Sequence, residues 1–206
     1  MSGVRIGIDF DNTIIRYDEV FASAAQRRGL VPEGWSGRKN ELRDYLRSQP
    51  GGELAWQGLQ GWVYGKGIGD ASIFPGMADF LAACRRAGAD VYVVSHKTQY
   101  GHQDPDRTDL RMAARNWMQG SGLIGSADSV LRLDRIYFED TLAAKVDRLA
   151  SLELDVFIDD LVDVFEQPHF PQRTQSILFA GADGSHPARF RRLASWAEIQ
   201  NEVFAA

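Results

Sequence analysis

Several features that define other protein classes are scarce in this chain of 206 residues. It has a single cysteine, Cys84, so it forms no internal disulfide, which favours a reducing, cytoplasmic location. No segment approaches the roughly 18 apolar residues of a membrane span. The first residues, MSGVRIGIDF, also lack the charged start and long apolar stretch of a secretion signal. We therefore expect no association with a membrane.

Basic residues are outnumbered by acidic ones, 23 against 28, and the net charge is −5. Binding to a phosphate backbone requires clustered lysine and arginine, so nucleic acid is not an expected partner. Two short basic runs, Arg27-Arg28 and Arg189 to Arg192, are interpreted as solvated helix faces. The chain length fits one well-buried domain, or one domain that carries a small insertion.

Short apolar runs alternate with amphipathic stretches along most of the chain. The runs are rich in β-branched and aromatic residues and too continuous for burial on one face only, which is typical of parallel strands. Between them lie stretches with helical spacing, and this alternation predicts an α/β fold with a Rossmann-like, doubly wound parallel sheet. The predicted strands are Val4–Phe10, Val91–Ser95, Arg135–Phe138, Val156–Asp159 and Ser176–Ala180, and the predicted helices are Met77–Ala87, Thr108–Gln119 and Thr141–Leu152.

Residues 18–71 interrupt the alternation, because they contain several helical patches and no convincing strand. We interpret them as a helical cap inserted after the first strand, with residues 1–17 and 72–206 forming the α/β core domain. The alternative is that these helices pack on the side of the sheet. Three tryptophans, Trp35, Trp56 and Trp62, lie in this segment and either form its core or stack on a ligand.

The segment IGIDFDNT, residues 6–13, places two aspartates and a threonine at alternate positions. Side chains at i and i+2 of an extended segment point the same way, so Asp9, Asp11 and Thr13 can converge at the end of a buried strand. Two carboxylates and a hydroxyl there suit a magnesium ion and a phosphoryl group. The alternative is an ordinary turn in which Asp11 and Asn12 bind their own backbone.

Other strand ends also carry polar residues. Ser95 ends the run VYVVS, where a hydroxyl and free N–H groups can bind phosphate oxygens. Lys145 lies in the helical stretch before the run VFIDD, where an ammonium can balance carboxylates and phosphate. That run ends in Asp159 and Asp160, and adjacent carboxylates repel each other unless a cation or hydrogen-bond donors offset the cost. Read singly, Ser95 also fits a strand-ending turn and Lys145 a solvated helix face.

Taken in order, these motifs resemble those of the haloacid dehalogenase superfamily of phosphohydrolases. The matching residues are Asp9-Phe10-Asp11-Asn12-Thr13, Ser95, Lys145 and Asp159-Asp160. The separation between the first two motifs leaves room for a helical cap. The resemblance covers most of the chain outside residues 18–71.

The resemblance implies a catalytic role for each of these residues. Asp9 is expected to be the nucleophile that forms an aspartyl-phosphate, and Asp11 the general acid and then the general base. Mg²⁺ is the expected cofactor, bound by Asp9, the Asp11 carbonyl and Asp159, with Asp160 direct or one shell further out. Thr13, Ser95 and Lys145 are expected to hold the phosphoryl oxygens.

An aspartate two positions after the nucleophile favours hydrolysis of phosphate esters, because an alkoxide leaving group needs a proton. Superfamily members that cleave carbon–halogen bonds or phosphonates usually lack this residue. A phosphonatase would also need a cap lysine, for which Lys39 and Lys66 are available. A phosphotransferase, or a non-hydrolytic protein that binds a phosphorylated metabolite and regulates a partner, stays open as an alternative.

The expected substrate is a small phosphorylated metabolite, such as a nucleotide or a sugar phosphate. The loop after Ser95 carries His96, Lys97, His102 and Arg107. We interpret His96 and Lys97 as substrate-binding, with the loop holding a second anionic group. The alternative is a solvated loop whose basic residues balance its neighbouring aspartates. The pattern leaves the identity of the substrate and the oligomeric state open.

Overall fold

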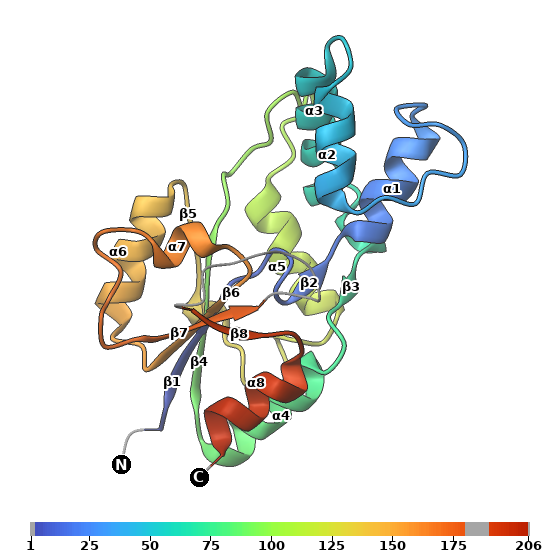
Figure 1. Ribbon diagram of the computed structural model, residues 1–206. Coiled ribbons are helices and arrows are strands. Elements are labelled where there is room, and N and C mark those ends of the chain that lie inside the picture. Colours follow the sequence, from blue (N-terminus) through green and yellow to red (C-terminus); the bar gives the residue numbers. More distant parts are fainter. Residues whose placement is uncertain (1–2, 180–189, 206) are drawn as a thin grey trace. The chain divides into compact units, whose positions relative to one another are not determined.

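A six-stranded parallel sheet is the central element of the computed structural model, which describes residues 3–179 and 190–205 (Figure 1). Its strand order is β5-β4-β1-β6-β7-β8, and every neighbouring pair is parallel. The strands are β1 (Arg5–Ile8), β4 (Asp90–His96), β5 (Ile136–Glu139), β6 (Val156–Asp159), β7 (Gln175–Phe179) and β8 (Arg191–Leu193). Because β1 lies between β4 and β6, the carboxyl ends of these three strands meet at one edge of the sheet.

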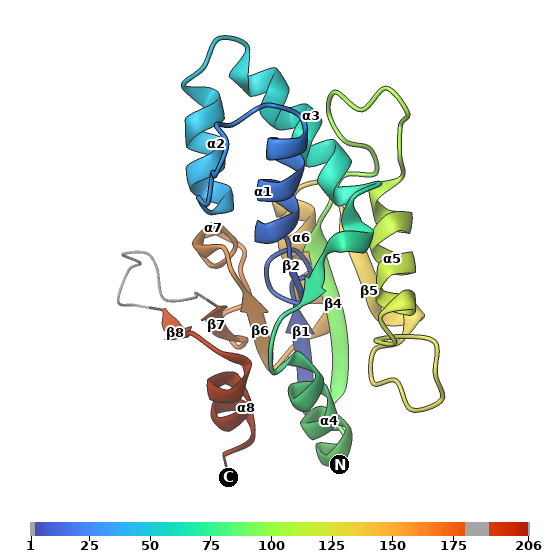
Figure 2. The same ribbon diagram turned by 90° about the vertical axis from the view of Figure 1, so that its right-hand side faces the viewer.

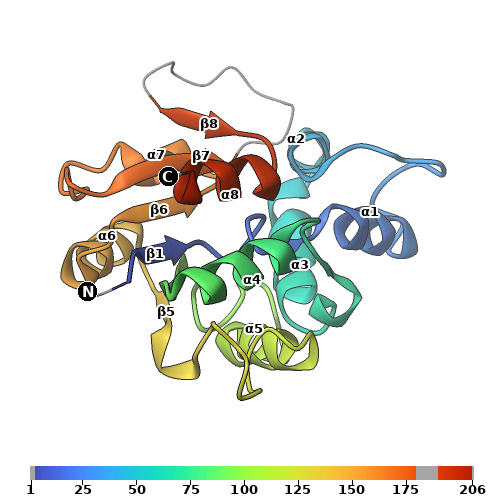
Figure 3. The ribbon, with the colours of Figure 1, turned by 90° about the horizontal axis from the view of Figure 1, so that it is seen from below.

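Helices cover both faces of this sheet, as Figure 3 shows most clearly. On one face, α6 (Leu142–Leu152) and α7 (Val162–Phe165) pack on a buried cluster that includes Val94, Phe157 and Leu178. On the other face lie α4 (Met77–Ala87) and α8 (Trp196–Phe204). Burial on both faces explains why β1, β4 and β6 read as nearly continuous apolar runs.

The α4 and α8 helices meet through aromatic side chains. Trp196 of α8 packs against Phe80 of α4 and Phe179 of β7, with ring centroids 4.8 and 5.3 Å apart. Leu178, the neighbour of Phe179 in the strand, belongs instead to the cluster under α6 and α7. Successive residues of β7 therefore serve the two opposite faces, as the pleat of a strand requires.

The chain divides into two compact units. The first contains the sheet and comprises residues up to 15, 73–97 and from 121 onward, whereas the second comprises residues 16–72 and 98–120. Two short strands, β2 (Ile15–Arg16) and β3 (Ser72–Ile73), pair where the chain passes between the units.

The second unit is helical, and its elements are seen best in Figure 2. In its core, Phe21 of α1 (Asp18–Arg27) stacks on the buried ring of Trp56 of α3 (Gly52–Tyr64), with ring centroids 5.2 Å apart. Tyr17 and Tyr64 pack edge-on around the same cluster. Trp56 is thus a core residue of this unit. The helices are α1 (Asp18–Arg27), α2 (Lys39–Arg47), α3 (Gly52–Tyr64) and α5 (Leu110–Gly120), with 3₁₀ turns at Ile68–Asp70 here and Leu133–Arg135 in the first unit.

The predicted α/β class with a doubly wound parallel sheet is confirmed, and each predicted strand has a counterpart in the sheet. Ala180, the predicted last residue of one strand, lies outside the described residues. The interpretation of Arg189 to Arg192 as a helix face is wrong at Arg191 and Arg192, which lie in β8. Both side chains are exposed on this edge strand, where charged residues are common. Among the described residues, no helix has the length and apolar character needed to cross a membrane.

Candidate active site

The loop that follows β1 brings the first motif to the edge of the sheet. Asp9 directly follows the strand, and its backbone N–H donates to the Ile158 carbonyl of β6 at 2.9 Å. The chain then turns sharply: the N–H groups of Ile14 and Ile15 both donate to the Phe10 carbonyl. Asn12 makes this turn possible with a left-handed φ of 59°, a conformation that asparagine tolerates better than most residues.

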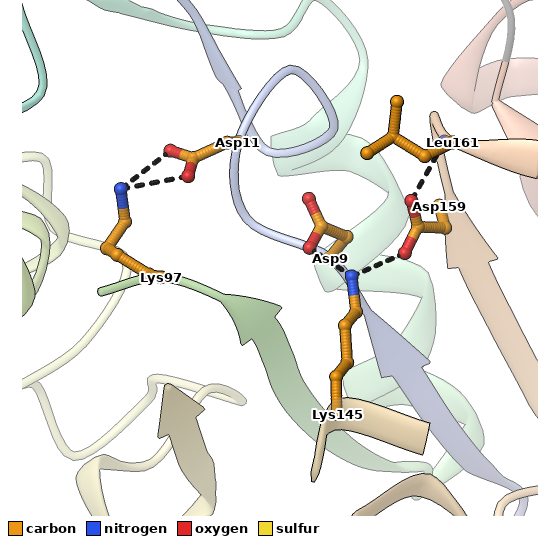
Figure 4. A network of polar contacts seen from close by, with 6 residues as sticks. All are labelled: Asp9, Asp11, Lys97, Lys145, Asp159 and Leu161. Atoms are coloured by element: carbon orange, nitrogen blue, oxygen red, sulfur yellow. Dashed lines mark hydrogen bonds and ion pairs between the residues drawn. The ribbon is translucent and has the colours of Figure 1, made fainter. Parts of the chain in front are cut away.

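Lys145 joins the ends of β1 and β6 through its ammonium group (Figure 4). Its Nζ lies 2.6 Å from Asp9 Oδ1 and 2.6 Å from Asp159 Oδ2. Thr141, at the start of α6, accepts a hydrogen bond from the Ala144 N–H and so fixes the first turn of the helix that carries Lys145. Asp159 Oδ1 accepts a further bond from the Leu161 N–H at 2.9 Å.

These three charged side chains are almost fully buried, since Lys145 is 2% exposed, Asp9 6% and Asp159 0%. Burial alone would lower the pKa of the Lys145 ammonium, but the charges of Asp159 and Asp9 outweigh it and raise that pKa. Burial raises the pKa of Asp159 to about 7; the ammonium opposes this rise and the Asp9 charge adds to it. The ammonium therefore does not fully offset the cost of burying Asp159 as a carboxylate.

The carboxylates at this edge also fit a metal ion. Carboxylate oxygens of Asp9, Asp159 and Asp160 all lie within 4.8 Å of one another. Oxygen donors of this kind suit a hard cation such as Mg²⁺, which binds through a few carboxylates and keeps several waters. A cation here would also offset the burial and the Asp9 charge that raise the pKa of Asp159. The donor set thus agrees with the predicted metal site.

A second buried lysine, Lys97, contacts the other aspartate of the first motif. Its Nζ lies 3.0 Å from Asp11 Oδ1 and 2.8 Å from Asp11 Oδ2 (Figure 4). The ammonium also lies 5.6 Å from the centroid of the Phe10 ring. Lys97 directly follows β4, and its N–H donates to the Glu139 carbonyl of β5. Its predicted contact with a substrate stays a prediction.

Two further predicted residues, Ser95 and His96, lie at the end of β4. Ser95 lies buried in β4, two positions before Lys97 and therefore on the same side of the strand. His96 is exposed, and its Nε2 donates to the Asp140 carbonyl at 3.0 Å. The remaining two basic residues of the predicted substrate loop, His102 and Arg107, belong to the second unit.

Thr13 is anchored from the far end of the sequence. Its backbone carbonyl accepts a hydrogen bond from Trp196 Nε1 at 3.2 Å. Its hydroxyl is buried and has no hydrogen-bond partner among the described residues. The phosphate contact predicted for this hydroxyl stays a prediction.

The sequence predicted a set of site residues but not several of the contacts among them. The pairing of Lys97 with Asp11 was not predicted. Neither the Leu161 N–H bonded to Asp159 nor the Trp196 anchor was predicted. Nothing in the sequence near Trp196 indicates that it reaches a loop at the other end of the chain.

No family model and no curated protein matches this sequence. Solved structures, in contrast, match over nearly its entire length. A predicted phosphatase from Clostridium acetobutylicum has a TM-score of 0.64 at 13% identity and covers 100% of both chains. A haloacid dehalogenase-like family hydrolase from Streptococcus pneumoniae has a TM-score of 0.62 at 16% identity, covering 98% of this chain and 99% of its own.

A third match is CbbY from Rhodobacter sphaeroides, solved in complex with phosphate. Its TM-score is 0.56 at 18% identity, with 96% of both chains covered. The chain therefore has the fold of the haloacid dehalogenase-like hydrolases. At these identities the likeness concerns the fold, so the chemistry rests on this chain's own residues.

Proposed function

We propose that this protein is a Mg²⁺-dependent phosphohydrolase that acts on a small phosphorylated metabolite through an aspartyl-phosphate. The observation that carries the proposal is the buried group in which Lys145 contacts Asp9 and Asp159 at 2.6 Å each, beside the carboxylate of Asp160. Such a concentration of buried charge is costly to a fold, which supports a functional role.

The metal would be held by Asp9 and Asp159, with the Asp11 carbonyl and Asp160 as further ligands. When bound, the ion offsets the repulsion between a carboxylate and a phosphate and supplies the charge that the single ammonium does not. This distribution of ligands rests on the carboxylate cluster and on the resemblance of the motifs.

Asp9 is the proposed nucleophile. One of its oxygens attacks phosphorus, the bond from phosphorus to the leaving oxygen breaks, and Asp11 supplies the proton that this oxygen takes up. In the second step Asp11 accepts a proton from the water that attacks phosphorus, and the bond between Asp9 and phosphorus breaks. Lys145, with Ser95 and Thr13, is proposed to bind the phosphoryl oxygens, and Lys145 also fixes the orientation of Asp9.

We also propose that residues 18–71 act as a cap that contributes to substrate selection. The chain leaves the first unit twice, after Ile15 and after Lys97, and both excursions start near carboxyl ends of strands that carry site residues. Selectivity in an α/β fold usually comes from segments that follow the carboxyl ends of strands. The substrate class proposed, a small phosphorylated metabolite, rests on this organisation and on the fold.

The test is a phosphatase assay with p-nitrophenyl phosphate and a panel of phosphorylated nucleotides, sugars and small acids, with MgCl₂ or with EDTA. We expect activity that requires Mg²⁺ and falls by at least about 1,000-fold in Asp9→Asn, because the amide is a poor nucleophile. Asp163→Asn is the matched control, since Asp163 is an exposed carboxylate close in sequence to Asp159 and Asp160 but outside the cluster.

Trapping the phosphoenzyme supplies a second readout. Rapid acid quench with a ³²P-labelled substrate should label wild type and leave Asp9→Asn unlabelled. Hydrolysis that survives Asp9→Asn would rule out Asp9 as the nucleophile. Absence of hydrolysis for every compound, together with saturable binding of one of them, would favour the alternative of a non-hydrolytic binding protein.

A further inference from the structure

Lys97 combines deep burial with contact to both oxygens of one carboxylate. Its side chain is 2% exposed, whereas that of Asp11 is 19% exposed. A buried ammonium has lost most of its hydration, so the Lys97 side chain is oriented by the carboxylate that replaces the lost water contacts. Its Nζ contacts both carboxylate oxygens of Asp11, at 3.0 and 2.8 Å.

The main chain around Lys97 is also held in place. Its N–H donates to the Glu139 carbonyl at 2.9 Å, which continues the pairing of β4 with β5. Asp11, in contrast, lies in the loop after β1, where a carboxylate side chain has several rotamers available. The lysine is thus a fixed donor, and the carboxylate is the group whose orientation it decides.

We propose that Lys97 is a positioning residue for Asp11, holding the carboxylate that carries the proton in both steps of the reaction. This inference rests on the proposed function. It assigns Lys97 a task different from phosphate binding: the ammonium restricts Asp11 to one orientation, from which it can reach the leaving oxygen and then the attacking water. Misplacement of a reacting group by about 1 Å can cost about 100-fold in rate.

The two steps depend on Asp11 to different degrees, which makes the role measurable. In the first step, the Asp9 oxygen bonds to phosphorus and the leaving oxygen departs, taking a proton from Asp11 unless it departs as a stable anion. In the second step, water bonds to phosphorus, its proton passes to Asp11, and the bond from Asp9 to phosphorus breaks. A good leaving group such as p-nitrophenolate removes the need for the proton in the first step only.

The experiment compares wild type with Lys97→Met on p-nitrophenyl phosphate and phenyl phosphate. For phenyl phosphate, kcat/KM should fall roughly 10- to 100-fold, because the first step has lost a well-oriented acid. For p-nitrophenyl phosphate, kcat/KM should stay within about threefold while kcat falls, and a burst of p-nitrophenolate should appear as the phosphoenzyme accumulates.

Three companion variants separate this role from others. Lys66 also pairs with an aspartate, Asp106, but this ion pair is exposed. The variant Lys66→Met should therefore match wild type in kcat and kcat/KM on both substrates. Lys97→Arg should recover part of the loss, since a guanidinium can also bind both carboxylate oxygens. In an Asp11→Asn background, Lys97→Met should add less than about twofold, because the group it positions is already gone.

The inhibition constant for inorganic phosphate tests the competing role, in which Lys97 binds the phosphoryl group directly. It should change by less than about threefold in Lys97→Met, and a large rise without any dependence on the leaving group would make Lys97 a phosphate ligand and overturn the proposal. An equal loss of kcat/KM on phenyl phosphate and p-nitrophenyl phosphate would also overturn the proposal. In either case wild-type hydrolysis leaves the proposed function standing, whereas wild type without any hydrolysis removes both.

An independent readout needs no turnover. In a crystal structure of Lys97→Met, the Asp11 carboxylate should occupy more than one orientation, whereas in wild type it should occupy one. A single unchanged orientation of Asp11 in the variant would contradict the proposal.

Discussion

Two buried lysines serve the same short segment in different surroundings. Lys145 contacts carboxylates that are themselves buried, whereas the partner of Lys97 is 19% exposed. Around Lys145 water is excluded and the electrostatic interactions are strong, which suits a group that stabilises charge. Around Lys97 the carboxylate keeps access to solvent, which suits a group that must exchange a proton. Burial of the partner, more than burial of the lysine, therefore separates the two proposed roles.

The largest expected effect comes from Lys145→Met. Without the ammonium, Asp9 and Asp159 stay buried with no cation between them, so the free energy of unfolding should fall by about 3–5 kcal/mol in EDTA. Because the charge on the phosphoryl group is also no longer balanced, kcat should fall by about 1,000-fold or more. Urea denaturation and the phosphatase assay measure the two effects.

The control for Lys145→Met is Lys66→Met, which should match wild type in stability within error because that ion pair is exposed. If Lys145→Met kept more than a tenth of the activity, the contrast between the two buried lysines would disappear.

The second expected effect is on pH dependence, measured without metal. The pKa of Asp159 is raised to about 7 in the folded protein, so between about pH 4 and 7 the folded state binds more protons than the unfolded state. The free energy of unfolding should therefore contain a component that falls as pH rises through this window. Urea titrations in EDTA at several pH values measure the slope.

Two comparisons test whether Asp159 causes that slope. Asp159→Asn should remove this component, and saturating MgCl₂ should do the same in wild type because the metal binds the ionised carboxylate. A slope that is the same in Asp159→Asn would show that other groups cause it.

A smaller effect is expected from Thr141→Ala, which removes the cap of the helix that carries Lys145. The Ala144 N–H loses its partner, so stability should fall by about 1 kcal/mol. Ser195→Ala removes the equivalent cap of α8, where Ser195 accepts from the Glu198 N–H, and it should cost a similar amount. Thr141→Ser should restore stability, and failure to do so would contradict the capping role. Thermal denaturation followed by circular dichroism is the measurement.

The smallest effect is a change in the reactivity of Cys84, a buried free thiol of α4. Burial raises the pKa of this thiol to about 12, so folded wild type should react slowly with an aromatic disulfide reagent. Lys145→Met should accelerate labelling by more than about tenfold because it raises the population of open states, and Lys97→Met by less than about threefold. Equal acceleration of labelling in both variants would contradict the prediction that Lys145→Met destabilises the folded state more than Lys97→Met does.

Much of the fold could be predicted because local sequence and tertiary environment agree. The helix Met77–Ala87 has the predicted bounds because glycines with left-handed φ stand on both sides, Gly76 at 84° and Gly88 at 65°. β6 also has the predicted bounds, since an apolar run ends in a charged residue at the sheet edge. β8 escaped prediction because it has three residues, two of them exposed arginines, and only pairing with β7 makes it a strand.

The candidate site was predictable as a set of positions but not as a set of contacts. Lys145 and Asp159 meet because α6, which carries Lys145, is followed directly by β6, which ends at Asp159. Which carboxylate Lys97 reaches depends on the turn after Phe10, and that turn depends on the left-handed φ of Asn12. The sequence allows a turn at Asn12 but does not give its direction, so only the structure shows that Lys145 contacts Asp9 and Lys97 contacts Asp11.

The hydrogen bond from Trp196 to the Thr13 carbonyl has a consequence for the order of folding. β1 acquires its neighbours only when β4 and then β6 have been made, and the loop after it acquires this tether only when residue 196 has left the ribosome. Contacts between such distant segments close slowly and late. The loop after β1 is therefore synthesised early but is among the last segments to reach its final geometry. Until then a nascent chain holds the two carboxylates of Asp9 and Asp11 without the contacts that restrain them.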